Sequence, residues 1–409
     1  SPYLERVRAA GVRPHVGHDA AHLPAGEDVQ IVVSTAIARD NPERAAARDR
    51  GLRELHRGEL LGEVSRLRRT IAVAGTHGKT TTASMAAHAL LGLGWDPSYL
   101  IGGELSTTGT NAAWGRGEWL VVEADESDRS FLQLAPEIAV VTNIELDHHT
   151  TYASHIELEE AFAQYLRGSL RVVVADTPQA EAFLDRAQIH EAAFAAASGV
   201  ELSPAGARFT WAEHTVAVGV PGAHNVANAA AALTACLLAG APRAGLATAL
   251  EGFRGAGRRF ERLGRTAAGA EVIDDYAHHP TEVRAAIAAA RTLGPRRVVA
   301  VFQPHLYSRT RLLAREFGAA LADADAICVL DVYPARERAE DFPGVGGLLV
   351  AEAAADAAHG RDVAWAPGFD AAERLLRTRL REGDVCLVLG AGNVDALGRR
   401  LVAGQMIGT

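Results

Sequence analysis

The chain has 409 residues, more than one hydrophobic core usually contains, so two or three domains are expected. Hydrophobic residues make up 48% and charged residues 22%, which is the balance of a globular protein and excludes a largely disordered chain. The formal net charge of −9 argues against nucleic acid as a partner, although local groups can still hold a nucleotide.

Short apolar strands alternate with longer Ala- and Leu-rich helical segments along the chain. A strand over residues 29–34 is followed by a helical segment, and the pattern recurs after strands at 71–74 and 298–302 and after VCLVLGAG near the end. This alternation predicts an α/β fold with parallel sheets covered on both faces. Ligands of such folds bind beyond the carboxyl ends of the strands, so polar residues that follow apolar runs are candidates for a site.

Three blocks are expected from the order of these segments. Residues 1–69 hold helix, strand and helix, residues 70–257 run from a glycine loop to an Ala-rich helix, and residues 258–409 begin with a strand-rich stretch. No apolar run approaches the ~20 residues of a membrane helix, and the N-terminus lacks the apolar segment of a secretory signal.

Three cysteines lie far apart in apolar surroundings, at Cys236, Cys328 and Cys386. This placement predicts reduced core residues rather than a disulfide framework, and it favours a cytoplasmic location.

A glycine-containing loop between a strand and an Ala-rich helix predicts a phosphate-binding site. The loop residues are Gly75, Thr76, His77, Gly78, Lys79, Thr80 and Thr81. Backbone N–H groups and the helix N-terminus favour an anion, Lys79 can reach the β- and γ-phosphates, and the Thr80 hydroxyl can join a Mg²⁺ shell. The strict spacing of the motif is absent, because Val73 stands where its first glycine belongs. The alternative is a tight turn with a solvated lysine.

Two later strands also end in polar residues. Glu123 follows a WLVV run and is suited to hold Mg²⁺, although four acidic residues in six would form a solvated loop in most proteins. His148, in TNIELDHH, follows the strand at 138–142 and could ligate a second metal or touch the γ-phosphate. Sixteen histidines make zinc the rival metal, but the chain lacks the H-E-x-x-H and Cys/His spacings typical of zinc sites.

Three further groups of polar residues lie downstream. Asn225 and Asn228 open a helix, where Asn225 could be merely an N-cap. Two later strands lead into stretches whose candidate residues are Asp275, His278, His305, Tyr307 and Arg309. Each group alone fits a capped or turn segment about as well as a functional site. Together they place His, Asp and Arg at the tips of several strands, which indicates a site.

The ordered set of these strings resembles the Mur ligase family over nearly the whole chain. The strings are AGTHGKTTT, EADESD, TNIELDH, HNVANA, GRRFERLG, DDYAHHPTEV, FQPHLYSRT and LGAGN. The resemblance implies three domains: a Rossmann-like UDP-binding domain, a central P-loop ATPase-type parallel sheet and a C-terminal Rossmann-like domain. It is strongest with the branch that uses ATP and Mg²⁺ to join L-alanine to UDP-N-acetylmuramate through an acyl phosphate.

The resemblance also implies roles for individual residues. Lys79 and the loop N–H groups would bind the β- and γ-phosphates, Thr80 and Glu123 would hold one Mg²⁺, and His148 would serve a second metal. Further positions would lie along the nucleotide, namely Asn225, Asn228, Arg259 and Asp275. The substrates would be met by Ser34, His278, His305, Tyr307 and Arg309, with the arginine on the alanine carboxylate.

The chain departs from the family's pattern in several places. Nothing like the family's N-terminal strand and Gly-rich turn precedes the first helix, so residues 1–69 are expected to be a partial UDP-binding domain with an exposed sheet edge. A second histidine, His149, follows His148 where relatives often have methionine. Leu306 stands where many members have arginine.

Three rival functions remain open. A family member that attaches a tripeptide to UDP-N-acetylmuramate has a related site. A nucleotide-dependent regulatory protein would not need the histidine and arginine groups near the end of the chain. An inactive, truncated protein is the third alternative. A monomer or a homodimer is equally compatible with the sequence.

Overall fold

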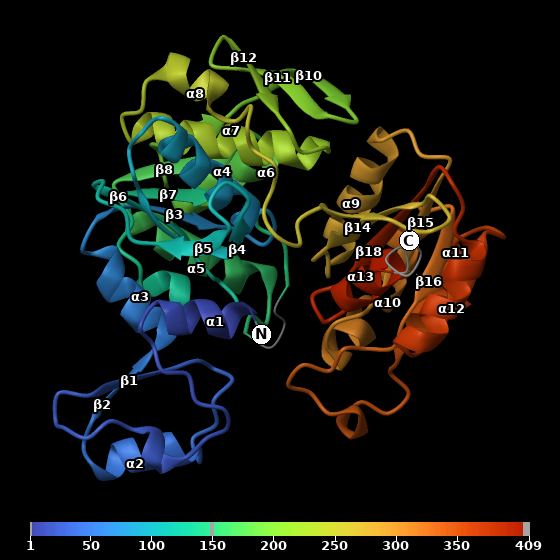
Figure 1. Cartoon of the computed structure of the whole chain (residues 1–409). Helices are drawn as coiled ribbons and strands as arrows, with labels where there is room; N and C mark the ends of the chain where they lie inside the picture. The colour runs from blue at the N-terminus through green and yellow to red at the C-terminus, as the bar shows by residue number, and fades with distance from the viewer. Residues whose placement is uncertain (1, 148–150, 404–409) are drawn as a thin grey trace. The chain divides into compact units, whose positions relative to one another are not determined.

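The structure is a computed structural model that describes residues 2–147 and 151–403. The chain divides into two compact units, Ser1–Leu67 and Arg68–Thr409 (Figure 1).

The first unit contains a small parallel sheet with helices beside it. Its elements are α1 (Pro2–Ala9), η1 (Ala20–His22), β1 (Gln30–Val33), α2 (Pro42–Asp49), β2 (Arg53–His56) and α3 (Arg57–Ser65). Strands β1 and β2 pair in parallel from Gln30↔Arg53 to Val33↔His56. The helix expected directly after the first strand begins only at Pro42, because the Asn41 side chain caps it by accepting the N–H groups of Glu43 and Arg44.

The first half of the second unit contains a sheet that is parallel except at one edge. Its elements are β3 (Arg69–Ala74), α4 (Lys79–Gly92), β4 (Ser98–Leu105), β5 (Thr110–Ala113), β6 (Trp119–Glu123), η2 (Ser130–Gln133), β7 (Ile138–Val141), α5 (His155–Arg167), β8 (Arg171–Ala175), α6 (Pro178–Ala187) and β9 (Ala193–Ala195). In the described residues the strand order is β5-β4-β6-β3-β7-β8-β9, with β5 antiparallel to β4. Since β6 and β7 flank β3, the carboxyl ends of these three strands meet at one place.

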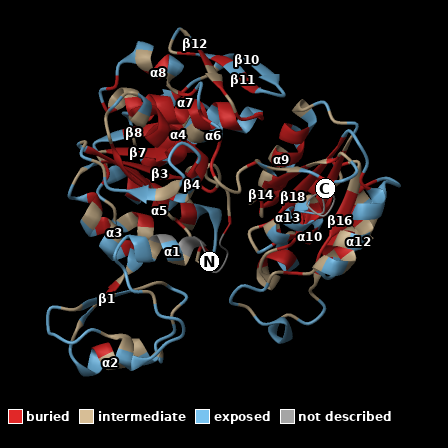
Figure 2. Ribbon diagram, viewed as in Figure 1, coloured by how far each residue is buried: buried red, intermediate tan, exposed pale blue. Residues whose placement is uncertain are grey.

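Helices cover both faces of this sheet. Ile71 and Val73 of β3 belong to one core with residues of α4 and of the later helix α7 (Ala223–Leu238). The other face receives α5, whose Tyr165 hydroxyl donates to the carbonyl of Ala72 at 2.7 Å. The central strands are buried on both faces of the sheet (Figure 2). Such strands consist of continuous apolar residues, which is why they could be predicted from the sequence.

An antiparallel sheet that the sequence did not predict follows the seven-stranded one. It consists of β10 (Ser198–Ser203), β11 (Gly206–Trp211) and β12 (His214–Val218), and leads into α7 and α8 (Arg243–Ala249). The indole N–H of Trp211 donates to the Thr234 hydroxyl of α7 at 3.1 Å, so the small sheet packs on the helix.

The last part of the chain forms a second mainly parallel sheet. Its elements are β13 (Glu261–Arg265), β14 (Glu271–Asp275), α9 (Pro280–Thr292), β15 (Arg297–Phe302), α10 (Tyr307–Leu321), β16 (Ala326–Val329), η3 (Ala339–Asp341), α11 (Gly347–Ala357), β17 (Asp362–Trp365), α12 (Phe369–Arg379), β18 (Asp384–Leu389) and α13 (Asp395–Ala403). The described strands run in the order β13-β14-β18-β15-β16-β17, with β13 antiparallel. Val298 faces a core with α9, α10 and α11, and its neighbour Val299 faces another with α12 and α13.

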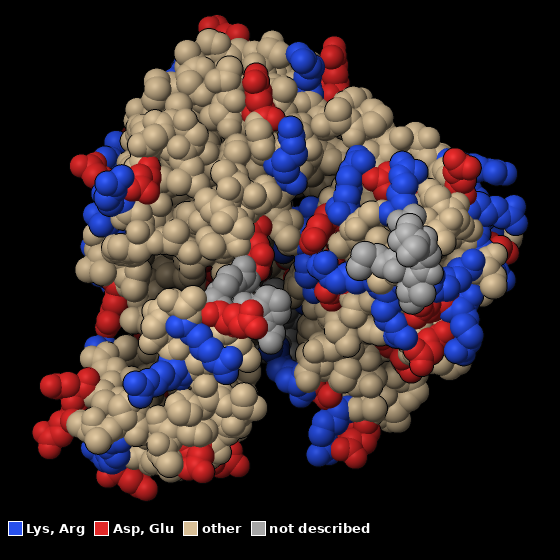
Figure 3. All heavy atoms as spheres, viewed as in Figure 1, with Lys and Arg blue, Asp and Glu red and all other residues tan. Residues whose placement is uncertain are grey.

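The predicted α/β class with parallel sheets is therefore confirmed, and the antiparallel edges and β10–β12 are additions to it. Across residues 2–147 and 151–403, every helix is too short or too polar to cross a bilayer. Basic and acidic side chains are interspersed over the face shown in Figure 3.

Candidate active site

The phosphate loop lies between β3 and α4, and its conformation requires two glycines. Gly75 has φ +133° and Gly78 has φ +82°. A Cβ on Gly75 would lie 2.1 Å from the Thr142 Oγ1 atom, and one on Gly78 would lie 2.4 Å from the Asn228 Oδ1 atom. The backbone N–H groups of Thr76 and His77 donate to the carbonyl and side-chain oxygens of Asn143, at 3.1 and 2.9 Å. Neighbouring strand ends therefore hold the loop in shape.

Lys79, the first residue of α4, is held by three oxygens. Its Nζ donates to the carbonyls of Gly75 and Thr76, at 2.6 and 3.1 Å, and to Glu126 Oε1 at 3.0 Å. The side chains of Lys79 and Glu126 are only 14% and 1% exposed. Burial disfavours the ammonium, but the surrounding carboxylates outweigh this effect, so the pKa of Lys79 is raised above its ordinary value. The lysine is charged and placed over the loop.

Thr80, Glu123 and Arg259 come together beside the lysine. The Thr80 hydroxyl donates to Glu123 Oε2 at 2.9 Å and accepts from Arg259 Nη2 at 3.2 Å. The backbone N–H of Gly102 on β4 also donates to Glu123 Oε2, at 2.9 Å. A hydroxyl and a carboxylate oxygen this close match the preference of Mg²⁺ for oxygen ligands, so these residues fit that ion. Arg259 brings the segment before β13 to the same point.

A cavity extends from the loop along α7 toward α9. Its walls include His77, Gly78, Thr81, Thr142, Asn143, Asn225, Asn228, Arg259, Asp275 and Thr281. Asn225 is not the N-cap that the sequence left open, because Gly222 precedes the first residue of α7. The Asn225 amide instead donates to the carbonyl of Pro221 at 2.7 Å and accepts from Asn228 at 3.3 Å.

Asp275, at the end of β14, has both carboxylate oxygens in contact with the backbone. They accept the N–H groups of Phe260 and Ala277, each at 2.8 Å. Burial raises the pKa of Asp275 to about 6, and the nearby Arg259 charge opposes part of that rise. The carboxylate therefore fixes the segment that carries Arg259.

The residues expected to meet the amino acid lie near one another at the ends of β14 and β15. The Arg309 Nη1 atom lies 3.3 Å from His305 Nδ1, and the rings of His278 and His305 are 6.2 Å apart. Burial lowers the pKa of His278 to about 3 and that of His305 to about 4, with the Arg309 charge contributing to both, so both rings are neutral. Tyr307 instead stacks on Phe342, with ring centroids 5.9 Å apart.

Two expected residues cannot be related to this site. His148 lies outside the described residues, although its neighbour Asp147 is described and pairs with Arg309 at 3.0 Å. Ser34 follows β1 in the first compact unit, where its carbonyl accepts the N–H of Ile37 at 3.1 Å.

Sequence reasoning missed several residues that organise the site. Glu126, Glu145, Asp147 and Glu282 stand inside the strings noticed in the sequence, but nothing local distinguished them from solvated acidic residues. The sequence did not single out Gly102, because a side chain is excluded there only by Glu123, whose carboxylate lies against this glycine in the folded chain.

Family models cover most of the chain in three consecutive segments. "Mur ligase family, catalytic domain" matches residues 1–69, "Mur ligase middle domain" matches 73–236, and "Mur ligase, glutamate ligase domain" matches 258–392. The expected three-domain α/β organisation is thereby confirmed.

Individual relatives agree with the family models. A UDP-N-acetylmuramate–L-alanine ligase of Streptomyces coelicolor is 44% identical over 98% of this chain and 90% of its own length. A protein of the same name from a Nocardioides species is 46% identical over 98% of this chain and 88% of its own. The crystal structure of a UDP-N-acetylmuramate–alanine ligase from Thermotoga maritima superposes with a TM-score of 0.81 and 26% identity, covering 98% of this chain and 90% of that one. The chain belongs to the Mur ligase family.

Proposed function

We propose that this chain joins L-alanine to the lactoyl carboxylate of UDP-N-acetylmuramate in peptidoglycan precursor synthesis. As a Mur ligase it is an ATP-dependent ligase that forms a carbon–nitrogen bond. The observation that carries the choice of substrates is the 44–46% identity, over 98% of the chain, to ligases named for these two substrates.

The reaction must make a carboxylate reactive toward an amine. A carboxylate oxygen attacks the γ-phosphorus of ATP, ADP leaves, and an acyl phosphate forms. The amine of L-alanine then attacks the acyl carbon, the tetrahedral intermediate collapses, and the amide, phosphate and a proton are released. Both partners of the first step are anions, so positioning and charge neutralisation are the main contributions that the protein can make.

The phosphate loop and Lys79 supply positive charge for that first step. Loop N–H groups and the Lys79 ammonium would hold the β- and γ-phosphates. To do so, Lys79 would replace its hydrogen bonds to the loop carbonyls and Glu126 with hydrogen bonds to phosphate oxygens. Thr80 and Glu123 would hold Mg²⁺, which supplies Lewis-acid polarisation of the phosphates when bound. The nucleotide would extend along Asn225, Asn228 and Asp275, which line the cavity.

The second step needs a pocket for L-alanine, and the group around Arg309 supports one. The Asp147 carboxylate accepts hydrogen bonds from Nε and Nη2 of Arg309, so the remaining nitrogen, Nη1, faces His305. We assign the alanine carboxylate to this edge of the guanidinium, with His278 and His305 as neutral walls. Tyr307 is assigned to the outer wall of the pocket and His148 to a second metal.

The family matches and the cysteines bear on the domain boundaries and the location of the protein. We propose domain boundaries near Arg69 and Gly257, close to the starts of the middle and C-terminal family matches at 73 and 258. Ser34 is assigned to the side of the first domain that meets the UDP substrate. A cytoplasmic location is supported by Cys236, Cys328 and Cys386, which are buried free thiols.

The decisive experiment is a product assay with the purified chain, ATP and Mg²⁺. Mass spectrometry should detect UDP-N-acetylmuramoyl-alanine when L-alanine is supplied, with ADP and phosphate in equal amounts. A preference for the tripeptide over L-alanine would indicate the recycling ligase instead. Phosphate release that does not depend on any amino acid would indicate a nucleotide switch, and absence of turnover with either donor would indicate an inactive protein.

A further inference from the structure

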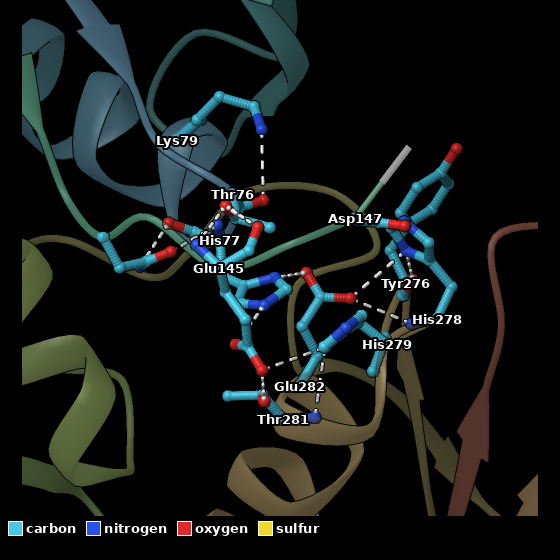
Figure 4. A network of polar contacts seen from close by, with 12 residues as sticks. Thr76, His77, Lys79, Glu145, Asp147, Tyr276, His278, His279, Thr281 and Glu282 are labelled. Atoms are coloured by element: carbon cyan, nitrogen blue, oxygen red, sulfur yellow. Dashed lines mark hydrogen bonds and ion pairs between the residues drawn. The ribbon is translucent and has the colours of Figure 1, made fainter. Parts of the chain in front are cut away.

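A second group of metal-ligating side chains lies beside the phosphate loop, apart from the Thr80–Glu123 pair. It consists of His77, Glu145 and His279, whose ligand atoms all lie within 4.8 Å of one another (Figure 4). His77 Nε2 is 3.0 Å from Glu145 Oε2, and His279 Nδ1 is 3.9 Å from Glu145 Oε1. The carboxylate thus lies between two imidazoles, whose ring centroids are 4.8 Å apart.

Each of the three side chains is held by the structure around it. His77 belongs to the phosphate loop, where its N–H donates to Asn143 Oδ1 at 2.9 Å. Glu145 lies beyond β7, its N–H donates to the Thr76 hydroxyl at 2.9 Å, and its carboxylate accepts the Thr281 hydroxyl at 2.7 Å. His279 is the N-cap of α9. These contacts leave little freedom for the group to disperse.

The outer nitrogen of His77 also has a carboxylate partner. His77 Nδ1 lies 3.2 Å from Glu282 Oε1, and the other oxygen of Glu282 accepts the His278 N–H at 2.9 Å. A carboxylate on the far nitrogen of an imidazole fixes its tautomer and strengthens its lone pair toward a metal.

Exposure of the group gives an ion a route in. The side chains of His77 and His279 are 13% and 5% exposed, whereas Glu145 is 41% exposed. The His77 ring lies between the carboxylates of Glu145 and Glu282, whose negative charges favour a cation at this place. His279 Nδ1 accepts the Thr281 N–H in a long contact of 3.4 Å, which ligation of a metal through this atom would replace.

We propose that His77, Glu145 and His279 form a binding site for a divalent transition metal of the Zn²⁺ class. Two imidazole nitrogens and one carboxylate oxygen are a typical three-residue set for such an ion, with water in the remaining position. The donors distinguish it from the all-oxygen Thr80–Glu123 pair, which suits Mg²⁺. Because its ligands come from the phosphate loop, the segment after β7 and the start of α9, an occupied site joins these three segments.

Co²⁺ is the probe, because its visible absorption reports nitrogen ligation and a low coordination number. The full chain, free of nucleotide, is titrated with Co²⁺ in millimolar Mg²⁺, and the titration is repeated in a Glu123→Gln background to remove the Mg²⁺ pair. We expect one Co²⁺ per chain with d–d bands of a four- or five-coordinate ion, displacement by Zn²⁺, and a higher Tm with Zn²⁺.

Variants separate this site from adventitious binding. His279→Asn keeps an N-cap acceptor on α9 but removes the imidazole, and it should weaken Co²⁺ binding by at least about tenfold, as should Glu282→Gln through the His77 tautomer. The matched control is His155→Gln, because His155 also lies near a glutamate, with its Nδ1 3.5 Å from Glu159, but outside the group. Binding unchanged by His279→Asn, loss of binding in His155→Gln, or octahedral Co²⁺ bands alone would each overturn the proposal.

Discussion

Arg309 of α10 and Asp147, which lies beyond β7, form a buried ion pair although they are 162 residues apart in sequence. The guanidinium Nε and Nη2 donate to Oδ1 at 3.2 and 3.0 Å, and Nη2 also donates to Oδ2 at 3.0 Å. The two side chains are 6% and 4% exposed. Each charge is therefore tolerated in the interior because the other is present.

Arg309→Ala should damage both stability and substrate use. Removing the guanidinium breaks a buried ion pair, which costs about 3–5 kcal/mol. The KM for L-alanine should also rise far more than the KM for ATP, because the proposed pocket loses its carboxylate partner. Urea denaturation and initial-rate kinetics with each substrate varied in turn measure the two effects.

The control is Asp147→Asn, which removes the ion pair but keeps the guanidinium. If Arg309 meets L-alanine directly, Asp147→Asn should lower stability without reproducing the selective rise in the L-alanine KM. Equal changes in the two KM values for Arg309→Ala would show that the residue serves only to hold α10.

Lys79→Met should abolish turnover, with a loss of several kcal/mol of transition-state stabilisation. It should also destabilise the fold, because the Glu126 carboxylate is 1% exposed and Lys79 is its countercharge. ATP consumption and thermal denaturation measure these effects independently.

The double variant Lys79→Met/Glu126→Gln distinguishes the two roles of the lysine. It should recover much of the stability that Lys79→Met loses, since the buried charge is gone, while turnover stays absent. Near-normal turnover in either variant would remove the phosphate-loop assignment.

The sequence singled out the parts of the candidate site whose signal is local. The phosphate loop and Glu123 could be predicted because each follows an apolar run, and neighbouring strand ends meet at one edge of a parallel sheet. The observed strand Trp119–Glu123 differs by one residue from the run at 119–122 that the sequence showed.

The parts that sequence reasoning missed depend on tertiary contacts. Glu126 belongs to an acidic run that looks the same whether it is solvated or buried under Lys79. Asn225 was open to an N-cap role because the sequence does not reveal that Gly222, with φ +98°, precedes the first helical residue. Strand β10 is exposed along its length, so it lacks the apolar alternation that would have marked it.

Gly102→Ala should raise the Mg²⁺ concentration needed for turnover. A Cβ at this position would lie 2.6 Å from Glu123 Oε2 and 3.2 Å from Thr80 Oγ1, so Glu123 must move away from the threonine. If Glu123 holds the ion as proposed, this displacement should weaken Mg²⁺ binding by about tenfold. Turnover as a function of Mg²⁺ at fixed ATP measures the change.

Gly92→Ala is the matched control, because a Cβ there meets nothing within 4 Å. It should leave the Mg²⁺ dependence unchanged. A Gly102→Ala protein with the same Mg²⁺ dependence as the parent would show that Thr80 and Glu123 do not hold the ion.

His305→Gln should make the protein less sensitive to acid. Burial lowers the folded-state pKa of His305 to about 4, aided by the charges of Arg309 and Arg336, from an ordinary value of 6.5. Above pH 6.5 the ring is neutral in both the folded and the unfolded chain. As the pH falls from 6.5 toward 4, the unfolded chain binds a proton that the folded chain does not, so stability falls by at most about 3 kcal/mol. The glutamine variant lacks this proton uptake, so urea denaturation between pH 4 and 8 should show a shallower decline in its stability.

The exposed His190 serves as the control through His190→Gln, whose pH profile should match that of the parent. An equal slope in the His305→Gln and parent proteins would mean that this ring binds its proton equally well in the folded state.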